Sequence, residues 1–239
     1  MSFPLKKIIQ GGMLAGILMF GVSVFGATYS NIDQMSGWQS CSVCAGAGGA
    51  GSVAPFSLRQ FISSPSMDGH SAQFNLGGTH PYSNALWWRQ LGANPGVKNF
   101  VYDLYYYIKN PSAPQSLEFD VNQALNGKKY IFGTECDFKW THTWHVYNPA
   151  AAHWVITSVP CRVPAAYTWN HIRLASHRNS NGSMTFVSVT VNGHTYYFNQ
   201  TYWPRAASSS ELNVAFQMDG NGTQTDYSVW LDRVTLTAF

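Results

Sequence analysis

Apolar and polar residues alternate with a period of two through most of the chain after residue 70, and turn residues separate the alternating segments. Because successive side chains of a β-strand point to opposite faces of a sheet, this alternation predicts strands. No segment of useful length shows the helical period. Short strands without helices are typical of a two-sheet antiparallel β-sandwich of the jelly-roll kind, so we predict an all-β fold. The predicted strands are Ala72–Leu76, Ala85–Gln90, Asn99–Lys109, Gln115–Gln123, Lys128–Glu135, Thr143–Tyr147, His153–Thr157, Trp169–Arg178, Met184–Val191, His194–Asn199, Glu211–Met218 and Asp226–Thr237.

The dipeptide Asn192-Gly193 is the sharpest turn signal in the chain, because it separates two alternating segments. Asn-Gly between strands is typical of a type I′ hairpin, in which both central residues need positive φ. We therefore predict a tight hairpin at this point.

The N-terminus has the features of an export signal. Lys6 and Lys7 form a short basic region, a nearly uncharged segment rich in apolar residues and glycine follows, and small residues stand where a signal peptidase would cleave. A membrane anchor is the alternative, since a span needs about 20 apolar residues, but the glycines and the lack of a basic stop-transfer flank favour cleavage. We expect a signal peptide at 1–26, a secreted or periplasmic protein, and no membrane partner after cleavage.

Residues 27–60 form a lead-in rich in Gly, Ser and Ala, and it contains Cys41 and Cys44. Its segment 45–52 has almost no side chain to bury, which predicts an extended or flexible loop. No low-complexity linker follows. We therefore predict one β-sandwich domain at 61–239, a length that is ordinary for a large sandwich.

Charged residues are scarce. They make up 10% of the chain, where about 25% is usual, while apolar residues make up 45%. This composition excludes a disordered chain, which needs high charge and few aromatic residues. Without Lys6 and Lys7 the formal net charge falls from +3 to +1, and no run of Lys or Arg remains. Binding to nucleic acid needs a dense basic patch, so we expect no nucleic-acid partner.

Four cysteines in an exported chain predict two disulfides. The economical pairing is Cys41–Cys44 with Cys136–Cys161, although four cysteines allow three pairings. A redox or zinc role for Cys41 and Cys44 is the alternative. It is disfavoured because no second Cys-x-x-Cys and no βαβ context follow.

Alternation also places polar and aromatic side chains together on one face of several predicted strands. Carboxylates and amides hydrogen-bond hydroxyl groups, while flat rings cover the apolar C–H patches of a sugar. Such faces are therefore suited to a carbohydrate ligand. The side chains placed in this way are Asp103, Tyr105, Tyr107, Glu118, Asp120, Asn122, His171, Arg173, His177, Asn213, Gln217 and Asp219.

The hexapeptide Glu118–Gln123 is the most informative motif. Here the chain resembles the concanavalin A-like lectin/glucanase superfamily. The laminarinase and lichenase branch carries Glu-x-Asp-x-Glu or Glu-x-Asp-x-x-Glu on one strand of the concave sheet, with the first Glu as nucleophile and the last as acid/base. The resemblance implies that Glu118 and Asp120 occupy the first two positions. The third position departs from the pattern, because Asn122 and Gln123 cannot donate a proton as an acid.

The same resemblance extends to a closing strand at 227–234 and implies a concanavalin A-like sandwich over roughly 60–239. A fold of this kind supports many functions, so the resemblance informs the fold more than the activity.

The spacing of Glu118 and Asp120 bears on catalysis. Residues i and i+2 of a strand are ~6.6–6.8 Å apart, whereas a retaining glycosidase needs carboxyls ~5–5.5 Å apart and an inverting one ~6.5–9.5 Å. Both would lie on one side of a substrate, so a hydrolase needs another acid from a neighbouring strand, such as Asp219 or Asp103. Catalysis, binding without chemistry and an inert surface remain alternatives, and binding is favoured.

His142, His145 and His153 lie close together in the sequence. On a strand, His142 and His145 point to opposite faces and cannot jointly bind an ion without a bulge. We predict no metal site and no cofactor, and leave a structural calcium ion open.

A polysaccharide lyase is a further alternative, because such enzymes pair Tyr or His with a group that neutralises a uronate. His171, Arg173 and Gln217 could supply such a set.

We therefore predict an exported protein that binds a polysaccharide or cell-wall glycan on a concave sheet face. A glycoside hydrolase or lyase that uses the same groove is the alternative, with Glu118 and Asp120 as its catalytic residues. A structural or adhesive envelope protein is the third, and it would bury its Trp side chains. The predicted binding residues are Asn122, Gln217, Asp219, Asp103, Tyr105, Tyr107, Arg173 and His171, together with an exposed Trp.

Overall fold

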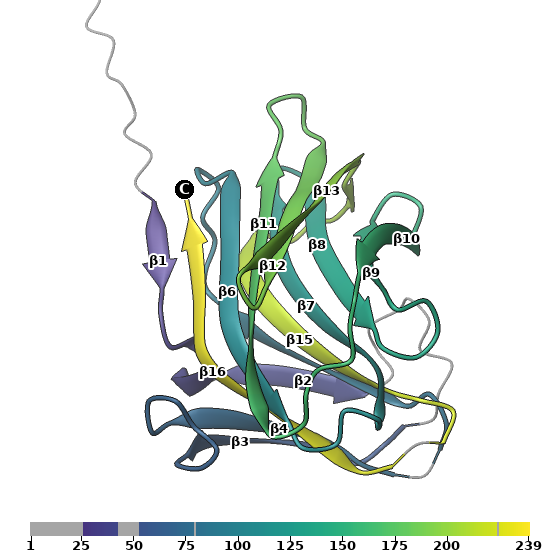
Figure 1. Ribbon diagram of the computed structural model, residues 1–239. Coiled ribbons are helices and arrows are strands. Elements are labelled where there is room, and N and C mark those ends of the chain that lie inside the picture. The colour runs from purple at the N-terminus through teal and green to yellow at the C-terminus, as the bar shows by residue number, and fades with distance from the viewer. Residues whose placement is uncertain (1–25, 43–52, 79, 224) are drawn as a thin grey trace, which may run out of the picture.

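The computed structural model describes residues 26–42, 53–78, 80–223 and 225–239. They form two antiparallel sheets of eight strands each, which confirms the predicted β-sandwich (Figure 1). The predicted signal peptide, Cys44 and the predicted loop at 45–52 lie outside the described residues, apart from Gly26. Within the described residues, no helix is long and apolar enough to cross a membrane.

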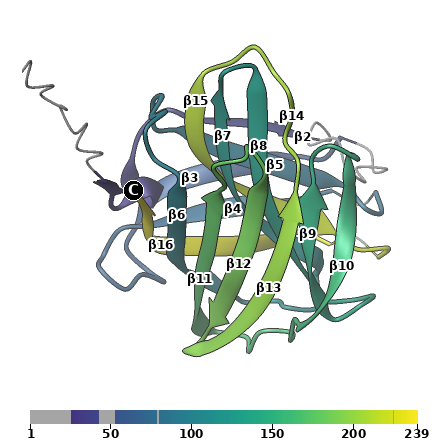
Figure 2. The same cartoon turned by 90° about the horizontal axis from the view of Figure 1, so that it is seen from above.

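The first sheet has seven strands in one path, and β1 (Ala27–Tyr29) is added by pairing with β16 (Figure 2). In spatial order the path runs β13 (His194–Tyr202), β12 (Met184–Val191), β11 (Thr168–Arg178), β6 (Asn99–Ile108), β16 (Tyr227–Ala238), β4 (Ser71–Leu76) and β3 (Phe56–Ile62).

The second sheet is built in the same way, and β14 (Arg205–Ala206) is added by pairing with β8. In spatial order its path runs β10 (His153–Pro160), β9 (Thr143–Asn148), β8 (Lys128–Asp137), β7 (Pro114–Leu125), β15 (Glu211–Gly220), β5 (Asn84–Gln90) and β2 (Trp38–Ser42).

Every strand that the alternation predicts is present. The hairpin at Asn192-Gly193 is confirmed, since both residues have positive φ (48° and 85°) and Val191 pairs with His194. The disulfide Cys136–Cys161 is also confirmed, and it ties the end of β8 to the residue after β10.

The lead-in contributes strands that the sequence analysis did not predict. β1 pairs with β16, and β2 pairs with β5, so the chain before residue 43 is part of both sheets. The boundary expected at residue 61 lies inside β3. β1 and β2 are short and show no clear alternation, and they become strands because a sheet edge offers unpaired N–H and C=O groups. A 3₁₀-helix, η1 (Ile32–Gln34), connects them.

Aromatic side chains from the inner faces of both sheets form the core. Phe74 of β4 lies with its ring centroid 5.2 Å from Trp87 of β5 and 5.0 Å from Phe216 of β15, and Phe119 of β7 lies 5.5 Å from Phe216. All four are at most 1% exposed. Truncation of such a side chain to Ala costs about 3–5 kcal/mol, so this cluster holds the sheets together and leaves their outer faces for other roles.

Candidate functional site

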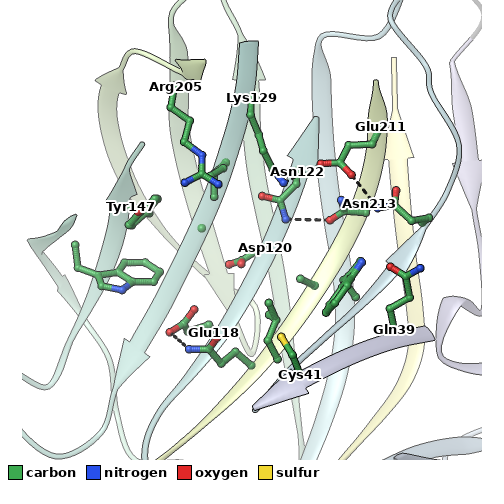
Figure 3. Close-up of a pocket in the computed structure, with 18 residues that line it drawn as sticks. Gln39, Cys41, Glu118, Asp120, Asn122, Lys129, Tyr147, Arg205, Glu211 and Asn213 are labelled. Carbon is green, nitrogen blue, oxygen red and sulfur yellow. Dashed lines mark hydrogen bonds and ion pairs between the residues drawn. The ribbon is translucent and has the colours of Figure 1, made fainter. Parts of the chain in front are cut away.

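The outer face of the second sheet is hollowed. One cavity of about 550 Å³ is lined by residues of β2, β5, β7, β8, β9, β10, β14 and β15 (Figure 3). A second cavity of about 540 Å³ shares Glu118 and Trp154 with the first, so the two adjoin. We call the two together the groove. Each of the two cavities lies within the range of about 300–1,000 Å³ that is usual for a small-molecule pocket.

The floor of the groove is a row of polar side chains on two central strands. Glu118, Asp120 and Asn122 alternate along β7 and appear in a row in Figure 3. Gln217 and Asn213 of β15 lie opposite Glu118 and Asn122 in the register. These side chains line a hollow instead of an open surface, and Glu118 is only 6% exposed and Asp120 8%.

Amide side chains connect this floor across the strands. Asn122 Nδ2 donates a hydrogen bond to Asn213 Oδ1 at 3.0 Å. Gln217 Nε2 donates to Glu118 Oε1 at 2.5 Å and to Asp219 Oδ1 at 3.0 Å. One amide nitrogen therefore bridges two carboxyl groups from neighbouring strands, which holds them close together.

Three carboxyl groups gather around Glu118. Glu135 of β8 pairs directly with Glu118, and Asp219 of β15 and Asp120 of β7 flank it. Burial raises the pKa of Glu118 well above its usual range, and the negative charges of Asp219, Asp120 and Glu135 add to the effect. Burial likewise raises the pKa of Asp120 and of Asp219 to about 7. The cluster therefore holds protons at a pH at which ordinary carboxyl groups have lost them.

Aromatic rings line the sides of the groove. Trp88 of β5 is half-buried beside the floor, while its neighbour Trp87 is in the core, as the alternation requires. On the other side Trp154 of β10 packs against Tyr147 of β9, with the ring centroids 5.3 Å apart. Trp140 lines the second cavity and is 75% exposed.

Gly133 of β8 gives these groups room. It pairs with Asp120, and a Cβ atom added there would lie 3.1 Å from Tyr147 Cβ, 3.3 Å from the Trp154 ring and 3.4 Å from Asp120 Oδ1. Any larger residue would displace the ring wall or the carboxyl group.

The structure divides the predicted binding residues between two faces. Asn122, Gln217 and Asp219 line the groove with Glu118 and Asp120. The remaining five are on β6 and β11 of the first sheet, and they are Asp103, Tyr105, Tyr107, His171 and Arg173. The two outer faces point in opposite directions with about 10 Å of core between the sheets, so one ligand cannot contact both sets. The expectation of a single site containing all of them is wrong.

The division also excludes two chemical alternatives, namely Asp103 as a further acid and the lyase set. Asp103 is not available as a further acid beside Glu118, because it belongs to the other sheet. The lyase set fails for the same reason, since His171 and Arg173 are on the first sheet and Gln217 is on the second.

Gln123, one of the two candidates for the third motif position, points away from the groove. Its Nε2 donates to the carbonyl groups of Asn94 and Val97, and its Oε1 accepts from Arg178 Nε. Gln123 therefore holds the loop that contains Asn94 and Val97. Of the two candidates, only Asn122 lines the groove.

Sequence reasoning missed several groove residues. Glu135 and Gly133 lie on a predicted strand, and the alternation of β8 could have placed both on one face. Their position beside Glu118 and Asp120 depends on which strand pairs with which. The groove residues missed in this way include Glu135, Gly133, Tyr147, Lys129, Arg205 and Glu211.

The three histidines lie in different surroundings. Among the described residues, no three His, Cys, Asp or Glu side chains come together as metal ligands. His145 is buried in the groove beside Thr141 Oγ1 at 2.7 Å, while His142 and His153 are exposed in or beside turns.

Two buried acids away from the groove have the donor type that a calcium ion prefers. Asp33 of η1 and Asp232 of β16 are fully buried, and Asp33 Oδ2 and Asp232 Oδ1 have no hydrogen-bond partner among the described residues. Asp33 Oδ1 and Asp232 Oδ2 accept from backbone N–H groups of Val234 and Met67. Calcium takes six to eight oxygen ligands, including carbonyl groups and water, so two carboxylates fit part of such a shell.

No protein-family model matches the chain, and no curated protein sequence matches it. Several solved structures resemble the chain at very low identity. "Cellulose induced protein, Cip1" has a TM-score of 0.53 at 9% identity, covering 87% of this chain and 96% of that one. A structure described as "carbohydrate-binding modules from the beta-sandwich super family" has a TM-score of 0.46 at 7% identity, and the match spans 85% of this chain but only 58% of that one. Lectin II from Ulex europaeus has a TM-score of 0.45 at 11% identity over 89% and 97% of the two chains.

The likeness to Cip1, at 9% identity, indicates a common fold and no more. The predicted resemblance to concanavalin A-like sandwiches is confirmed at the level of the fold only.

Proposed function

We propose that this chain binds a carbohydrate polymer in the groove of the second sheet. The observation that carries the proposal is the floor of buried carboxyl and amide groups between half-buried aromatic rings. Carboxylates and amides accept and donate hydrogen bonds to hydroxyl groups with defined geometry. The rings of Trp88 and Trp154 offer flat apolar surfaces to the C–H faces of sugars. Neither element alone would discriminate a sugar from other small polar molecules.

The shape of the groove favours an extended ligand. Its two cavities adjoin at Glu118 and Trp154, and the row from Glu118 to Asn122 continues the floor along β7. A chain of several sugar rings would contact more of this surface than one ring would.

A structural envelope protein would be expected to bury its Trp side chains. Trp140 is instead 75% exposed and Trp203 56% exposed, and Trp88 and Trp154 line the groove. These positions support binding over a purely structural role.

We also propose that the protein is exported. Disulfides persist in oxidising compartments, and Cys136–Cys161 is such a bond. Export would bring the groove into contact with extracellular or cell-wall glycans.

The direct test is a glycan array probed with the protein from residue 27 onward, followed by isothermal titration with soluble oligosaccharides of each hit. We expect retention on one class of polymer, and loss of retention when Asn122 and Asn213 are both replaced by Ala. Failure to bind any glycan at concentrations up to about 1 mM, the weak end of specific binding, would refute the proposal.

Glycan hydrolysis is a second candidate, and one observation favours it. Gln217 Nε2 donates hydrogen bonds to both Glu118 and Asp219, so two carboxyl groups from neighbouring strands lie close together, and a glycosidase also works with a pair of neighbouring acids. The raised pKa of Glu118 suits a proton donor. Asp219 would then take the position that the resemblance leaves without an acid on β7.

Product analysis on the array hits decides between the two. A hydrolase releases reducing ends, and Glu118→Gln abolishes this release while the protein is still retained on the polymer. A binding protein releases none, and the same substitution changes only its affinity.

A further inference from the structure

The end of the groove beyond Asn122 carries two cations on neighbouring strands. Arg205 of β14 pairs directly with Lys129 of β8, and both line the groove. Figure 3 shows both side chains directed into the cavity from the same end. Like charges directly opposite on paired strands are destabilising, so this arrangement calls for a compensating anion.

The protein supplies one anion for these two cations, and it is already engaged. Glu211 Oε1 lies 2.8 Å from Lys129 Nζ, and Glu211 Oε2 accepts a hydrogen bond from Gln90 Nε2 at 2.9 Å. Both oxygens of Glu211 therefore have partners. Arg205 has no hydrogen bond or ion pair with any of the described residues, and its side chain is exposed to the groove. One positive charge is left at this end.

The opposite end of the groove carries acids instead of cations. Glu118, Asp219 and Glu135 gather there, and Asp120 lies between the two ends. From the level of Glu118 to the level of Ala124, which pairs with both Lys129 and Glu211, the strand advances about 20 Å at 3.3–3.4 Å per residue. A ligand that spans the groove thus meets hydrogen-bonding acids at one end and an unpaired guanidinium at the other.

We propose that the ligand is a glycan that combines neutral sugars with an acidic group, and that Arg205 binds this group. The planar guanidinium donates two parallel hydrogen bonds to a carboxylate or sulfate, which an ammonium group cannot do. Lys129 adds a second positive charge beside it. A polymer with an anion on every sugar fits poorly, because it would place negative charge against the acids around Glu118. This inference rests on the proposed function and names the substrate class of the same groove.

The test uses uronate-bearing oligosaccharides and their carboxyl-reduced counterparts, which keep the same backbone without the charge. A parallel set of sulfated oligosaccharides distinguishes a sulfate from a carboxylate as the acidic group, and a polyuronate tests the charge density. The variants are Arg205→Gln and, as the matched control, Arg173→Gln, which removes an exposed Arg from the outer face of the first sheet.

We expect the wild-type protein to bind the acid-bearing chain at least about tenfold more tightly than its reduced counterpart. Arg205→Gln should remove this preference and leave the affinity for the reduced chain unchanged, whereas Arg173→Gln should change neither. Raising the salt concentration from about 0.05 to about 0.5 M should weaken only the binding that depends on the acidic group.

The inference is overturned if the wild-type protein binds both chains equally, if Arg205→Gln weakens both to the same extent, or if the polyuronate binds most tightly. In those cases glycan binding itself still stands. If no oligosaccharide of either kind binds, the proposed function fails together with this inference.

Discussion

The outer faces of the two sheets carry similar residue types in different arrangements. On the first sheet, Asp103 Oδ1 lies 2.8 Å from His171 Nε2, and the ring of Tyr105 stacks on His171 at 4.6 Å. Tyr107 packs against Trp169, with centroids 5.4 Å apart. These groups satisfy one another. On the second sheet, carboxyl groups crowd together in a hollow, where burial raises the pKa of Glu118 and of Asp219 and neighbouring negative charges raise it further.

The difference shows what separates a polar surface from a binding surface. A face whose charges and rings are paired internally gains nothing from a ligand, because the ligand would have to displace existing contacts. A face whose acids crowd together in a hollow lined by Trp88 and Trp154 leaves hydrogen bonds and apolar area for an external partner.

The strongest test of this comparison uses two matched aromatic pairs. Trp154 packs on Tyr147 in the groove, and Trp169 packs on Tyr107 on the first sheet. We expect Trp154→Ala to weaken glycan binding about 30-fold, or about 2 kcal/mol, and Trp169→Ala to leave it unchanged. Titration calorimetry on one array hit measures both, and thermal melts check that each variant is folded. Equal losses in the two variants would contradict the assignment of the groove.

The crowded carboxyl groups predict a pH dependence of stability. The pKa values of Asp120 and Asp219 are about 7, above their usual value, so the folded state binds more protons than the unfolded state. The free energy of unfolding should therefore fall as the pH rises from about 4 to about 7, by an amount on the order of a few kcal/mol for the two acids together.

Urea unfolding at several pH values measures this effect. Asp219→Asn should flatten the decline relative to the wild-type protein, whereas Asp103→Asn on the other face should not. An unchanged slope in Asp219→Asn would show that burial and neighbouring charge do not raise the pKa of Asp219 in the folded protein.

Gly133 tests whether the shape of the groove wall matters for binding. Gly133→Ala brings a Cβ atom to 3.1 Å from Tyr147 and 3.3 Å from Trp154, so the ring wall must shift by a few tenths of an ångström. We expect binding to weaken about fivefold, equivalent to about 1 kcal/mol, with a smaller loss of stability. The variant should lose more binding free energy than free energy of unfolding. Unchanged affinity would mean that the wall between β8 and β10 does not contact the ligand.

The smallest effect is expected on the first sheet. Asp103→Asn removes one charge from a partly exposed pair with His171, which costs at most about 1 kcal/mol of stability. Binding to every glycan should be unchanged. A clear loss of binding would place a ligand on the first sheet and reverse the comparison.

Much of this architecture could be predicted from the residues alone, because strand alternation and turn chemistry are local. The hairpin at Asn192-Gly193 and the inward and outward positions of Trp87 and Trp88 follow from backbone rules that need no partner strand. The edge strands β1 and β2 did not follow, because only the exposed edges of β16 and β5 make strands of them.

The candidate site was only partly predictable for a similar reason. Glu118 and Asp120 share a strand, so their common face was clear. Glu135 is 17 positions further along the chain and Asp219 about 100, and each reaches Glu118 through strand pairing. Tyr105 showed the same alternation as Glu118, yet the chain passes to the other sheet between β6 and β7 and separates them.

The sequence by itself determined the strands from residue 71 onward except the short β14, the faces of these strands and the residue types suited to a sugar. Those properties depend on residues two to four positions apart, and the sequence gives such residues directly. Only the tertiary structure decided which polar face is hollow, which acids crowd around Glu118, and that Arg205 stands unpaired beside Lys129. Those properties depend on the pairing order of strands distant in the chain, which sets the distances over which charges and rings interact.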